Sequence, residues 1–510
     1  MEKELKIHEM SITVDKNNDF SQWYRQIVLK SNMIKYYDVS GCYVLLPNSY
    51  GLWENIKEFL DTQFKKLGVE NCYFPLFITK SNMEKEKEHI EGFQPEVAWV
   101  TKIGNLEDKG NKDDKEDNNL VEPLAIRPTS ECAMYPIFPS LIKSHKDLPL
   151  KLNQWCNVVR WEFKDPYPFI RSREFLWQEG HTCFSNKEDA IKEVETIINI
   201  YKNCYENLLA SPVIKGIKTE KEKFAGGELT FTLEGFIPEI GKGLQACTAH
   251  YLGQNFSKMF EITYQNEKEE KNFIHQNSWG FTTRSIGAMI MTHSDNKGLI
   301  IPPNIAKLQI IIIPILFKNK EILVLDFVKK VHEQLSKDYK GLFSVKIDYS
   351  DHNPGWKFNY WEVQGVPLRF EIGPKDATNN NIVFCRRDTG EKKIISFDEK
   401  ICNTINSVLD EMQMNLFNIA KNKFYSRIKC PLSKDEFIDD INNKNMCMIY
   451  WCDTNDCENL IKEITMTKSL CKPLDDDLFK NVNVKKCLDI KTCIFCGKEN
   501  KELCIFGKSF

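Results

Sequence analysis

The sequence predicts an α+β protein of several domains, in which an antiparallel sheet comes first and α/β units follow. The chain has 510 residues, too many for one ordinary domain and enough for roughly two to four. A proline-marked hairpin between Arg160 and His181 supplies two adjacent antiparallel strands. After Pro302 and Pro303 a strand–helix–strand pattern begins, which is typical of an α/β module.

The first domain, expected at residues 1–302, contains two clear helical patterns. Apolar residues recur at helical spacing between Leu52 and Leu67, and Ser49 is a suitable N-cap for this helix. The run Cys72–Ile78 is then predicted to be extended. A second, amphipathic helix is expected over Lys187–Leu209. Its buried stripe would consist of Ile191, Val194, Ile197, Ile198, Tyr201 and Leu208.

The second domain, expected at residues 303–405, is predicted from strands that alternate with helices. A helix is expected to end at Leu335. The most hydrophobic segment, Ile310–Phe317, is short and interrupted by Pro314, which suits a buried strand rather than a membrane span. The strands are expected at residues 308–315, 343–349, 367–372 and 382–386.

The composition limits the location and the partners of the chain. The net charge of −3 gives no strong overall field, so nucleic acid contacts must come from local patches, and we expect no DNA partner and no membrane partner. The first residues, Met1 to Lys6, lack the apolar core of a signal peptide, so a cytoplasmic location is expected. The 18 cysteines are then expected to be reduced thiols or metal ligands. The polar residues 105–119 are predicted to form a surface loop without chemistry.

The hairpin carries the strongest functional signal. If both limbs are strands, Arg160 and Glu162 share one face of the first limb, because side chains alternate with period two. The corresponding face of the return limb contains Arg171, Arg173, Phe175, Trp177, Glu179 and His181. A face that mixes cations, a carboxylate and large aromatic rings is suited to hold something charged and flat. The alternative is an exposed hairpin with salt bridges, but such hairpins rarely place Phe and Trp among arginines.

The segment Gln276–Gly287 is predicted to be a strand that enters a helix. Thr282 or Thr283 can cap this helix, which places Arg284 in the first turn, beside backbone N–H groups that favour an anion. An arginine there adds a bidentate phosphate partner. Because the chain has no Walker-type loop, a nucleotide would have to be held by such arginines. The alternative is a surface arginine on an ordinary helix.

Two shorter segments are weaker candidates. In Arg127–Glu131, Thr129 or Ser130 can cap a helix with Glu131 at its start. In Gln245–His250, small residues would let a substrate approach the backbone. A capped helix and a buried histidine remain the simpler interpretations.

These motifs, taken together, resemble the prolyl-tRNA synthetases, class II aminoacyl-tRNA synthetases, in their eukaryotic and archaeal form. The resemblance covers Asp19 to Phe510. Its elements occur in the order of the family: Tyr73–Pro75, Arg127–Glu131, Arg160–His181, Lys223–Gly227, Gly253–Glu261 and Gln276–Gly287. It implies a class II catalytic domain built on an antiparallel sheet, an α/β anticodon-binding domain and a small α/β zinc-binding C-terminal domain at residues 406–510. It also implies a homodimer, with Tyr73–Pro75 at the interface.

The resemblance implies a two-step reaction. The enzyme would activate L-proline with ATP to prolyl-adenylate and pyrophosphate, then transfer proline to the 3'-terminal ribose of tRNA(Pro). No side-chain nucleophile is needed; Arg160, Glu162 and Arg284 would be the catalytic residues. The residues that would bind ATP, with Mg²⁺, are Arg160, Glu162, Arg171, Phe175, Gln245, Thr248 and Arg284. Those that would bind proline are Thr129, Glu131, Arg160, Trp177, Glu179, His181, Phe224, His250 and Ser278.

Further residues are implied in the other two domains. The resemblance assigns the anticodon contacts to Phe358, Glu362, Arg369, Lys375 and Asp376, a mixture of aromatic and charged groups that suits unpaired bases. For the aromatic residues, core packing is the alternative. The last domain holds two closely spaced pairs, Cys452 with Cys457 and Cys493 with Cys496, which suit a structural zinc site. Scattered reduced thiols are the alternative there.

The chain departs from the family pattern at three positions. Ala246 and Cys247 stand where relatives usually have glycines, which would crowd the site slightly. Phe510 stands where a tyrosine is usual, so a hydroxyl contact would be missing.

Only the segment Thr182–His275 separates the hairpin from the segment Gln276–Gly287, and this length is too short to include an editing insertion. Two rivals remain: a synthetase-like RNA-binding protein without catalysis, and a sister enzyme for threonine or histidine.

Overall fold

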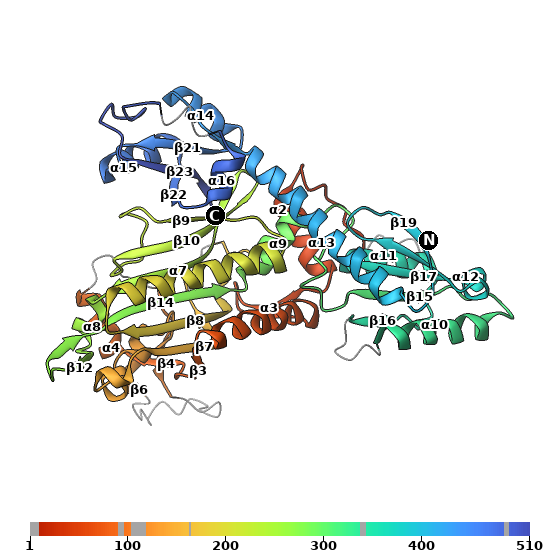
Figure 1. Cartoon of the computed structure of the whole chain (residues 1–510), viewed down its shortest axis with the longest axis horizontal. Coiled ribbons are helices and arrows are strands. Elements are labelled where there is room, and N and C mark those ends of the chain that lie inside the picture. Colours follow the sequence, from red (N-terminus) through yellow and green to blue (C-terminus); the bar gives the residue numbers. More distant parts are fainter. Residues whose placement is uncertain (1–9, 90–95, 104–118, 163–164, 337–342, 484–488) are drawn as a thin grey trace, which may run out of the picture.

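The computed structural model describes residues 10–89, 96–103, 119–162, 165–336, 343–483 and 489–510. Figure 1 shows a large sheet with its helices, a smaller α/β domain to one side, and a C-terminal part above the sheet. The long helix α13 (Ile401–Ser426) runs from the α/β domain to the C-terminal part. The expected loop at residues 105–119 lies almost wholly outside the described residues; Asn119 begins strand β6 (Asn119–Ile126).

The centre of the molecule is an eleven-stranded sheet. Its strands, in spatial order, are β20 (Ile428–Lys429), β21 (Met446–Trp451), β23 (Glu502–Ser509), β22 (Lys468–Pro473), β9 (Ile214–Ile217), β10 (Leu229–Ile237), β11 (Lys242–Gly253), β14 (His275–Thr282), β8 (Glu174–Phe184), β7 (Leu150–Val159) and β3 (Glu70–Asn71). From β21 through to β7 each successive pair of strands is antiparallel, whereas the edge strands β20 and β3 pair in parallel with β21 and β7. The predicted antiparallel catalytic sheet is confirmed.

Helix α7 (Lys187–Asn203) covers one face of this sheet, as Figure 1 shows. Its buried residues include Val194, Ile197, Ile198 and Tyr201, as predicted, whereas Ile191 is only partly buried. The prediction of one helix through Leu209 was wrong, because the last turn, Cys204–Leu208, is a π-helix (η2).

Helix α3 (Pro47–Lys66) begins three residues before the predicted start, because its N-cap is Leu46 and not Ser49. Pro47 occupies its first position, where its fixed φ suits the helix and its missing N–H costs nothing. The prediction that Ser49 caps this helix was wrong: Ser49 is buried within the first turn, and its hydroxyl donates to Met33 O at 2.6 Å. Helices α2 (Phe20–Lys30) and α9 (Arg284–His293) complete this core, with the fully buried Trp23 and Tyr24.

The second domain is a five-stranded sheet. Its strands, in spatial order, are β16 (Val345–Ile347), β15 (Ile310–Pro314), β17 (Leu368–Ile372), β18 (Asn381–Arg386) and β19 (Lys392–Ser396). The predicted strands are confirmed, and β15 is buried along its whole length. Helix α11 (Pro354–Gln364) contributes to the core on the Ile311 and Ile313 face, while α10 (Glu321–Ser336) packs with Ile310 and Ile312.

The C-terminal part is joined to the catalytic sheet by strand pairing. Pro473 of β22 pairs with Gly216 of β9, and Ser509 of β23 pairs with Gly243 of β11. The expected boundary between residues 405 and 406 lies within α13. The described residues of this part include the helices α14 (Lys434–Asn442), α15 (Asn455–Thr465) and α16 (Asp476–Asn481).

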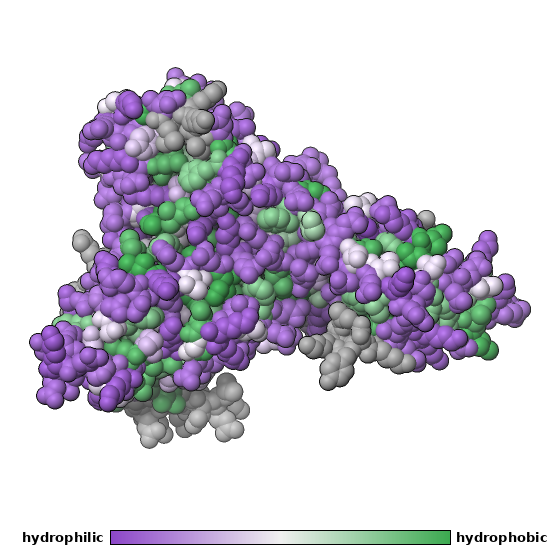
Figure 2. Space-filling view, in the orientation of Figure 1, coloured by the Kyte–Doolittle hydropathy of each residue, from purple (hydrophilic) through white to green (hydrophobic). Residues whose placement is uncertain are grey.

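Smaller elements surround the main sheets. They are β1 (Ile34–Tyr36), β2 (Tyr43–Leu45), β4 (Phe77–Thr79), α4 (Lys80–His89), β5 (Trp99–Lys102), α5 (Glu131–Met134), α6 (Phe138–Leu141), the 3₁₀ turn His145–Asp147, α8 (Asn255–Met259), β12 (Thr263–Gln265), β13 (Lys271–Phe273) and α12 (Pro374–Asn379). Figure 2 shows that hydrophilic residues dominate this face of the molecule and that apolar patches on it are small. Among the described residues, none of the helices combines the length and the apolar character needed to cross a bilayer.

Candidate active site

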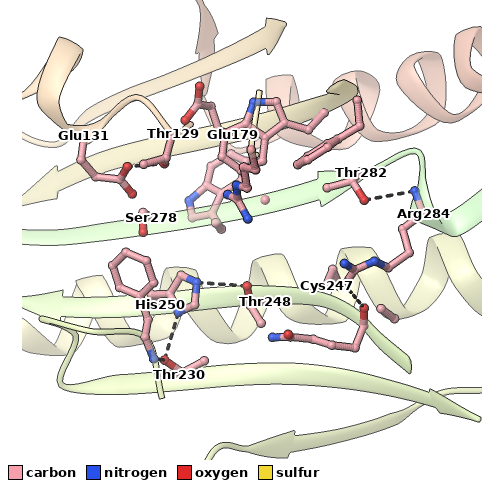
Figure 3. Close-up of a pocket in the computed structure, with 18 of the residues that line it drawn as sticks. Thr129, Glu131, Glu179, Thr230, Cys247, Thr248, His250, Ser278, Thr282 and Arg284 are labelled. Atoms are coloured by element: carbon pink, nitrogen blue, oxygen red, sulfur yellow. Dashed lines mark hydrogen bonds between the residues drawn. The ribbon is translucent and has the colours of Figure 1, made fainter. Parts of the chain in front are cut away.

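A cavity of about 340 Å³ opens over the central strands of the large sheet. On β14, Ser278 lines the cavity, while the adjacent Asn277 donates to Ala190 O of α7 at 2.8 Å. Neighbouring residues of a strand point to opposite faces. The cavity therefore lies on the sheet face that α7 leaves uncovered (Figure 3).

The structure brings most of the expected catalytic-site residues together around this cavity. Those that line it are Thr129, Glu131, Arg160, Phe175, Trp177, Glu179, His181, Phe224, Gln245, Thr248, His250, Ser278 and Arg284. Two expected ATP-binding residues, Glu162 and Arg171, are not part of the lining. Glu162 is exposed beyond the end of β7, and Arg171 exchanges two backbone hydrogen bonds with Tyr167.

The predicted arrangement of the hairpin was only partly right. From Phe175 to His181, alternate residues of β8 do line one cavity, as the period of two predicts. Arg160, Arg171 and Arg173 instead lie in the connection, because β7 ends at Val159 and β8 begins at Glu174. Alternation gives no information there. Arg173 accordingly turns away: its Nη1 donates to Ser40 O at 3.0 Å, and its guanidinium lies 4.6 Å from the centre of the Trp161 ring.

One end of the cavity is cationic. Arg284 begins α9, as predicted. The N-cap residue, Thr283, makes no capping hydrogen bond with its side chain, but the Thr282 hydroxyl accepts the backbone N–H of Arg284 at 3.1 Å (Figure 3). The Arg284 side chain is held by Ile170 O at 3.2 Å and Gln245 O at 3.0 Å. Burial lowers the pKa of Arg284, and repulsion from Arg160 and Arg171 adds to this effect. Arg160 and Arg284 both line the cavity, and an anion bound there would relieve the repulsion between them.

The opposite end of the cavity carries buried carboxylates. Glu131 is 3% exposed and accepts a hydrogen bond from the Thr129 hydroxyl, drawn in Figure 3. Glu179 is 2% exposed; its Oε2 lies 3.1 Å from His181 Nε2, while Ser130 and Gln154 donate to its Oε1.

Glu179 and His181 form a buried ion pair. Burial alone would raise the pKa of Glu179, but His181 lowers it; burial would lower the pKa of His181, but the hydrogen bond with Glu179 and the charge of Glu131 raise it. Because this ion pair carries no net charge, the other buried carboxylate, Glu131, is what suits this end to a small cationic group.

His250 and Phe224 form the floor of the carboxylate end. Their ring centres are 4.5 Å apart. His250 lies 3.0 Å from the Thr230 hydroxyl through Nδ1 and 3.0 Å from the Thr248 hydroxyl through Nε2. Burial lowers the pKa of His250 to about 3, and His181 contributes to this shift. His250 is therefore neutral, and the two threonine hydroxyls hold its ring in place at this end of the cavity.

Several lining residues were not predicted to bind a ligand. They are Phe169, Ile170, Ser172, Glu222, Thr230, Ala246, Cys247, Trp279, Gly280 and Thr282. Phe169 has a positive φ of 62°, which no local pattern indicated. Thr230 also receives the Phe224 N–H at 3.0 Å, but its position depends on the pairing of β10 with β11, which is not visible in the sequence. Ala246 and Cys247 are both buried, beside an irregularity in that pairing.

In the second domain the five expected RNA contacts fall into two groups. Arg369 lies 4.6 Å from the centre of the Phe358 ring and donates to Glu371 at 2.9 Å. Glu362 is on the same helix as Phe358. Lys375 and Asp376 lie in the first turn of α12, where Asp376 accepts from the Gly373 N–H at 2.9 Å.

In the C-terminal part the four expected cysteines form a cluster. The sulfur atoms of Cys452, Cys457, Cys493 and Cys496 all lie within 4.8 Å of one another. A zinc ion bound by four thiolates at about 2.3 Å holds its sulfur atoms about 3.8 Å apart, so the cluster fits such an ion. None of the cysteines in the described residues is in a disulfide.

Comparisons with known proteins agree with this geometry. Residues 113–293 match the model of the class II tRNA synthetase core domain (G, H, P, S and T). Residues 309–403 match the anticodon binding domain, and residues 434–510 match the C-terminal domain of prolyl-tRNA synthetases.

Relatives and solved structures match nearly the whole chain. The cytoplasmic proline–tRNA ligase of Arabidopsis thaliana is 44% identical over 98% of this chain and 91% of its own length. The proline–tRNA ligase of Clostridium novyi is 43% identical over the full length of both. Prolyl-tRNA synthetase of Cryptosporidium parvum, solved with L-proline and AMP, has a TM-score of 0.89 and 46% identity, covering 99% of this chain and 98% of that one. The same protein with halofuginone and AMPPNP has a TM-score of 0.90 and 47% identity, covering 98% and 100%. This chain belongs to the prolyl-tRNA synthetases, a family of class II aminoacyl-tRNA synthetases.

Proposed function

We propose that the cavity activates L-proline with ATP and then charges the 3'-terminal ribose of tRNA(Pro). The observation that carries this proposal is the polarity of the cavity, with arginines at one end and buried carboxylates and aromatic rings at the other. The proline carboxylate attacks the α-phosphorus, and the bond to pyrophosphate breaks. The ribose hydroxyl then attacks the acyl carbon of the adenylate and releases AMP. The first step needs two anions, the carboxylate and ATP, held together, which arginines achieve without a side-chain nucleophile.

At the cationic end, Arg160 is proposed to contact the α-phosphate and the proline carboxylate. Its Nε donates to Pro128 O at 3.0 Å, which fixes the direction of the guanidinium group. Arg284 and Arg171 are proposed to hold the β- and γ-phosphates, supported by the electrostatic effect of Arg171 on Arg284. Phe175 offers a flat face to adenine, and Gln245 and Thr248 offer polar atoms beside it.

At the other end, Glu131 is proposed to accept the secondary ammonium of proline. Trp177, Phe224 and His250 would enclose the ring, while Thr129 and Ser278 complete the wall. The Glu179–His181 pair is proposed to fix the polar side of this pocket.

Class II synthetases use ATP with a divalent metal, which we propose is Mg²⁺. The ion takes much of its coordination from phosphates and needs only one or two protein carboxylates. Glu162 lies two residues beyond Arg160, which lines the cavity, and its exposed carboxylate is proposed for this role. When bound, the ion would neutralise phosphate charge.

We propose that the cysteine cluster binds one structural Zn²⁺. Cys457→Ser is expected to reduce the zinc content from about one per chain to near zero, because a tetrahedral thiolate site needs all four ligands. The same variant is expected to make the C-terminal part more sensitive to protease, since metal binding stabilises such folds. Metal analysis and limited proteolysis measure both effects. Cys471→Ser, a buried cysteine outside the cluster, should keep its zinc. Zinc retained by Cys457→Ser would contradict this assignment.

We further propose a cytoplasmic homodimer that reads tRNA with its second domain. The small sheet formed by β4, β6 and β5 supports the dimer interface, because Phe77, Trp99 and Val121 are exposed on it and Tyr73 precedes it with 71% exposure. The name of the Arabidopsis relative supports the location. Sedimentation of the purified chain tests the dimer.

The RNA contacts are tested by Arg369→Ala. This variant is expected to lose tRNA(Pro) charging while it activates proline normally.

The purified enzyme is expected not to hydrolyse mischarged alanyl-tRNA(Pro). Alanine is smaller than proline by two carbons, each worth only about 1–3 kcal/mol of discrimination, so some mischarging follows. Within the described residues between β8 and β14, the chain forms α7, η2, β9–β13 and α8, which leave no separate editing domain. A deacylation assay with alanyl-tRNA(Pro) should give the rate seen without enzyme. Rapid hydrolysis would show an editing site.

The two alternative functions predict different results in a pyrophosphate exchange assay. A synthetase-like protein without catalysis would show no amino acid-dependent exchange of pyrophosphate into ATP. A sister enzyme for threonine or histidine would show exchange with that amino acid. The enclosed aromatic pocket around Phe224 and Trp177 favours proline.

A further inference from the structure

The segment Lys218–Glu222, which leads from β9 to Phe224, lies along the C-terminal part of the chain. Lys218 Nζ donates to Leu470 O of β22 at 2.8 Å. Lys221 Nζ donates to the side chain of Asn459 on α15. Glu222, which lines the cavity, forms an ion pair with Lys468 at 3.5 Å. Three side chains of one short segment therefore bond to the C-terminal part.

The centre of this contact is a buried group of two hydroxyls and a carboxylate. Thr219, Ser469 and Glu458 are 2%, 1% and 3% exposed. The Ser469 hydroxyl donates to Glu458 Oε1 at 2.5 Å, the Thr219 hydroxyl lies 3.4 Å from the same oxygen, and the two hydroxyls are 3.0 Å apart. Apolar contacts would allow the two segments to slide against each other. The buried hydrogen-bond network is fully satisfied in only one arrangement, and this fixes the position of Thr219.

Thr219 also starts the turn that delivers Phe224 to the cavity. Its carbonyl oxygen accepts from the N–H groups of Glu222 and Lys223 at 3.2 and 2.9 Å. Directly after this turn, the Phe224 N–H donates to Thr230, and the Phe224 ring packs on His250. A shift of Thr219 would therefore move the ring that closes the carboxylate end.

We propose that Glu458 and Ser469, in the C-terminal part, are positioning residues for proline recognition. They hold Thr219, and through its turn they set where Phe224 closes the pocket. This inference rests on the proposed function, in which that pocket holds proline. Glu458 follows Cys457 on α15, so the same helix carries a residue of the cysteine cluster and the anchor of the pocket turn.

Thr219→Val tests this proposal, because it removes the hydroxyl and keeps the shape. The readout is proline-dependent exchange of labelled pyrophosphate into ATP by the full-length chain. We expect the KM for proline to rise about fivefold, the effect of one net hydrogen bond, while kcat and the KM for ATP change less than about twofold. Thr219→Ser restores the hydroxyl and should restore the KM. Ser469→Ala removes the hydroxyl on the C-terminal side of the same network and should raise the KM for proline by a similar factor. It therefore tests the proposal even if Thr219→Val folds poorly.

Thr465→Val is the matched control. Its hydroxyl is also buried in the C-terminal part, but it bonds to Ile461 and Thr467. This variant can lower the melting temperature, yet it should leave the KM for proline unchanged. The proposal is overturned if Thr219→Val leaves that KM unchanged, if it alters the KM values for proline and ATP alike, or if Thr465→Val has the same effect. Absence of proline-dependent exchange by the unmodified chain would instead overturn the proposed function itself.

Discussion

Arg160→Ala is expected to abolish proline-dependent exchange of pyrophosphate into ATP, a loss of about 10³-fold or more. The guanidinium group lines the cavity and lies 5.5 Å from the ring centres of both Phe175 and Trp177, at the junction of the two proposed subsites. Removing it leaves the negative charge that develops on the α-phosphate without its partner. Arg160→Lys keeps the charge but loses the bidentate geometry, so we expect an intermediate loss.

Arg173→Ala is the matched control for this variant. Arg173 comes from the same hairpin connection, but it bonds to Ser40 and packs on Trp161 instead of lining the cavity. Its exchange rate should stay within about tenfold of the unmodified chain, the range of a structural substitution outside the cavity. Near-normal exchange by Arg160→Ala would contradict the role given to Arg160.

Glu131→Gln is expected to lower kcat/KM for proline by about 10²-fold, because truncating or neutralising one partner of a buried charged pair costs several kcal/mol. The KM for ATP should change little, since Glu131 lies at the end of the cavity away from Arg284 (Figure 3). Exchange measured against each substrate separates the two effects.

Glu174→Gln removes a carboxylate from the first residue of β8, where the side chain is exposed and accepts from Asn157. It should behave like the unmodified chain. An unchanged KM for proline in Glu131→Gln, or an equal rise in both KM values, would remove Glu131 from the proline subsite.

The chemistry of the site was predictable where local sequence determines local geometry. The alternation from Phe175 to His181 follows from strand periodicity, and Arg284 at the start of α9 follows from a polar strand end before a helix. Arg173 was misplaced because the same periodicity was applied beyond the strand, in a connection shaped by Pro166 and Pro168.

Other features depend on contacts between distant segments. Thr219 and Glu458 are 239 positions apart, and nothing near either residue indicates the other. The continuation of the catalytic sheet into the C-terminal part depends likewise on the pairing of β9 with β22. Such contacts arise from tertiary packing, so they cannot be predicted from the secondary-structure propensity of either segment alone.

The most direct test of the account is exchange of labelled pyrophosphate into ATP by the purified, full-length chain, with proline, threonine or histidine as the only amino acid. Exchange is expected to saturate with proline and to stay at background with the other two amino acids. Background exchange with proline, or exchange driven by threonine or histidine instead, would contradict the proposed function.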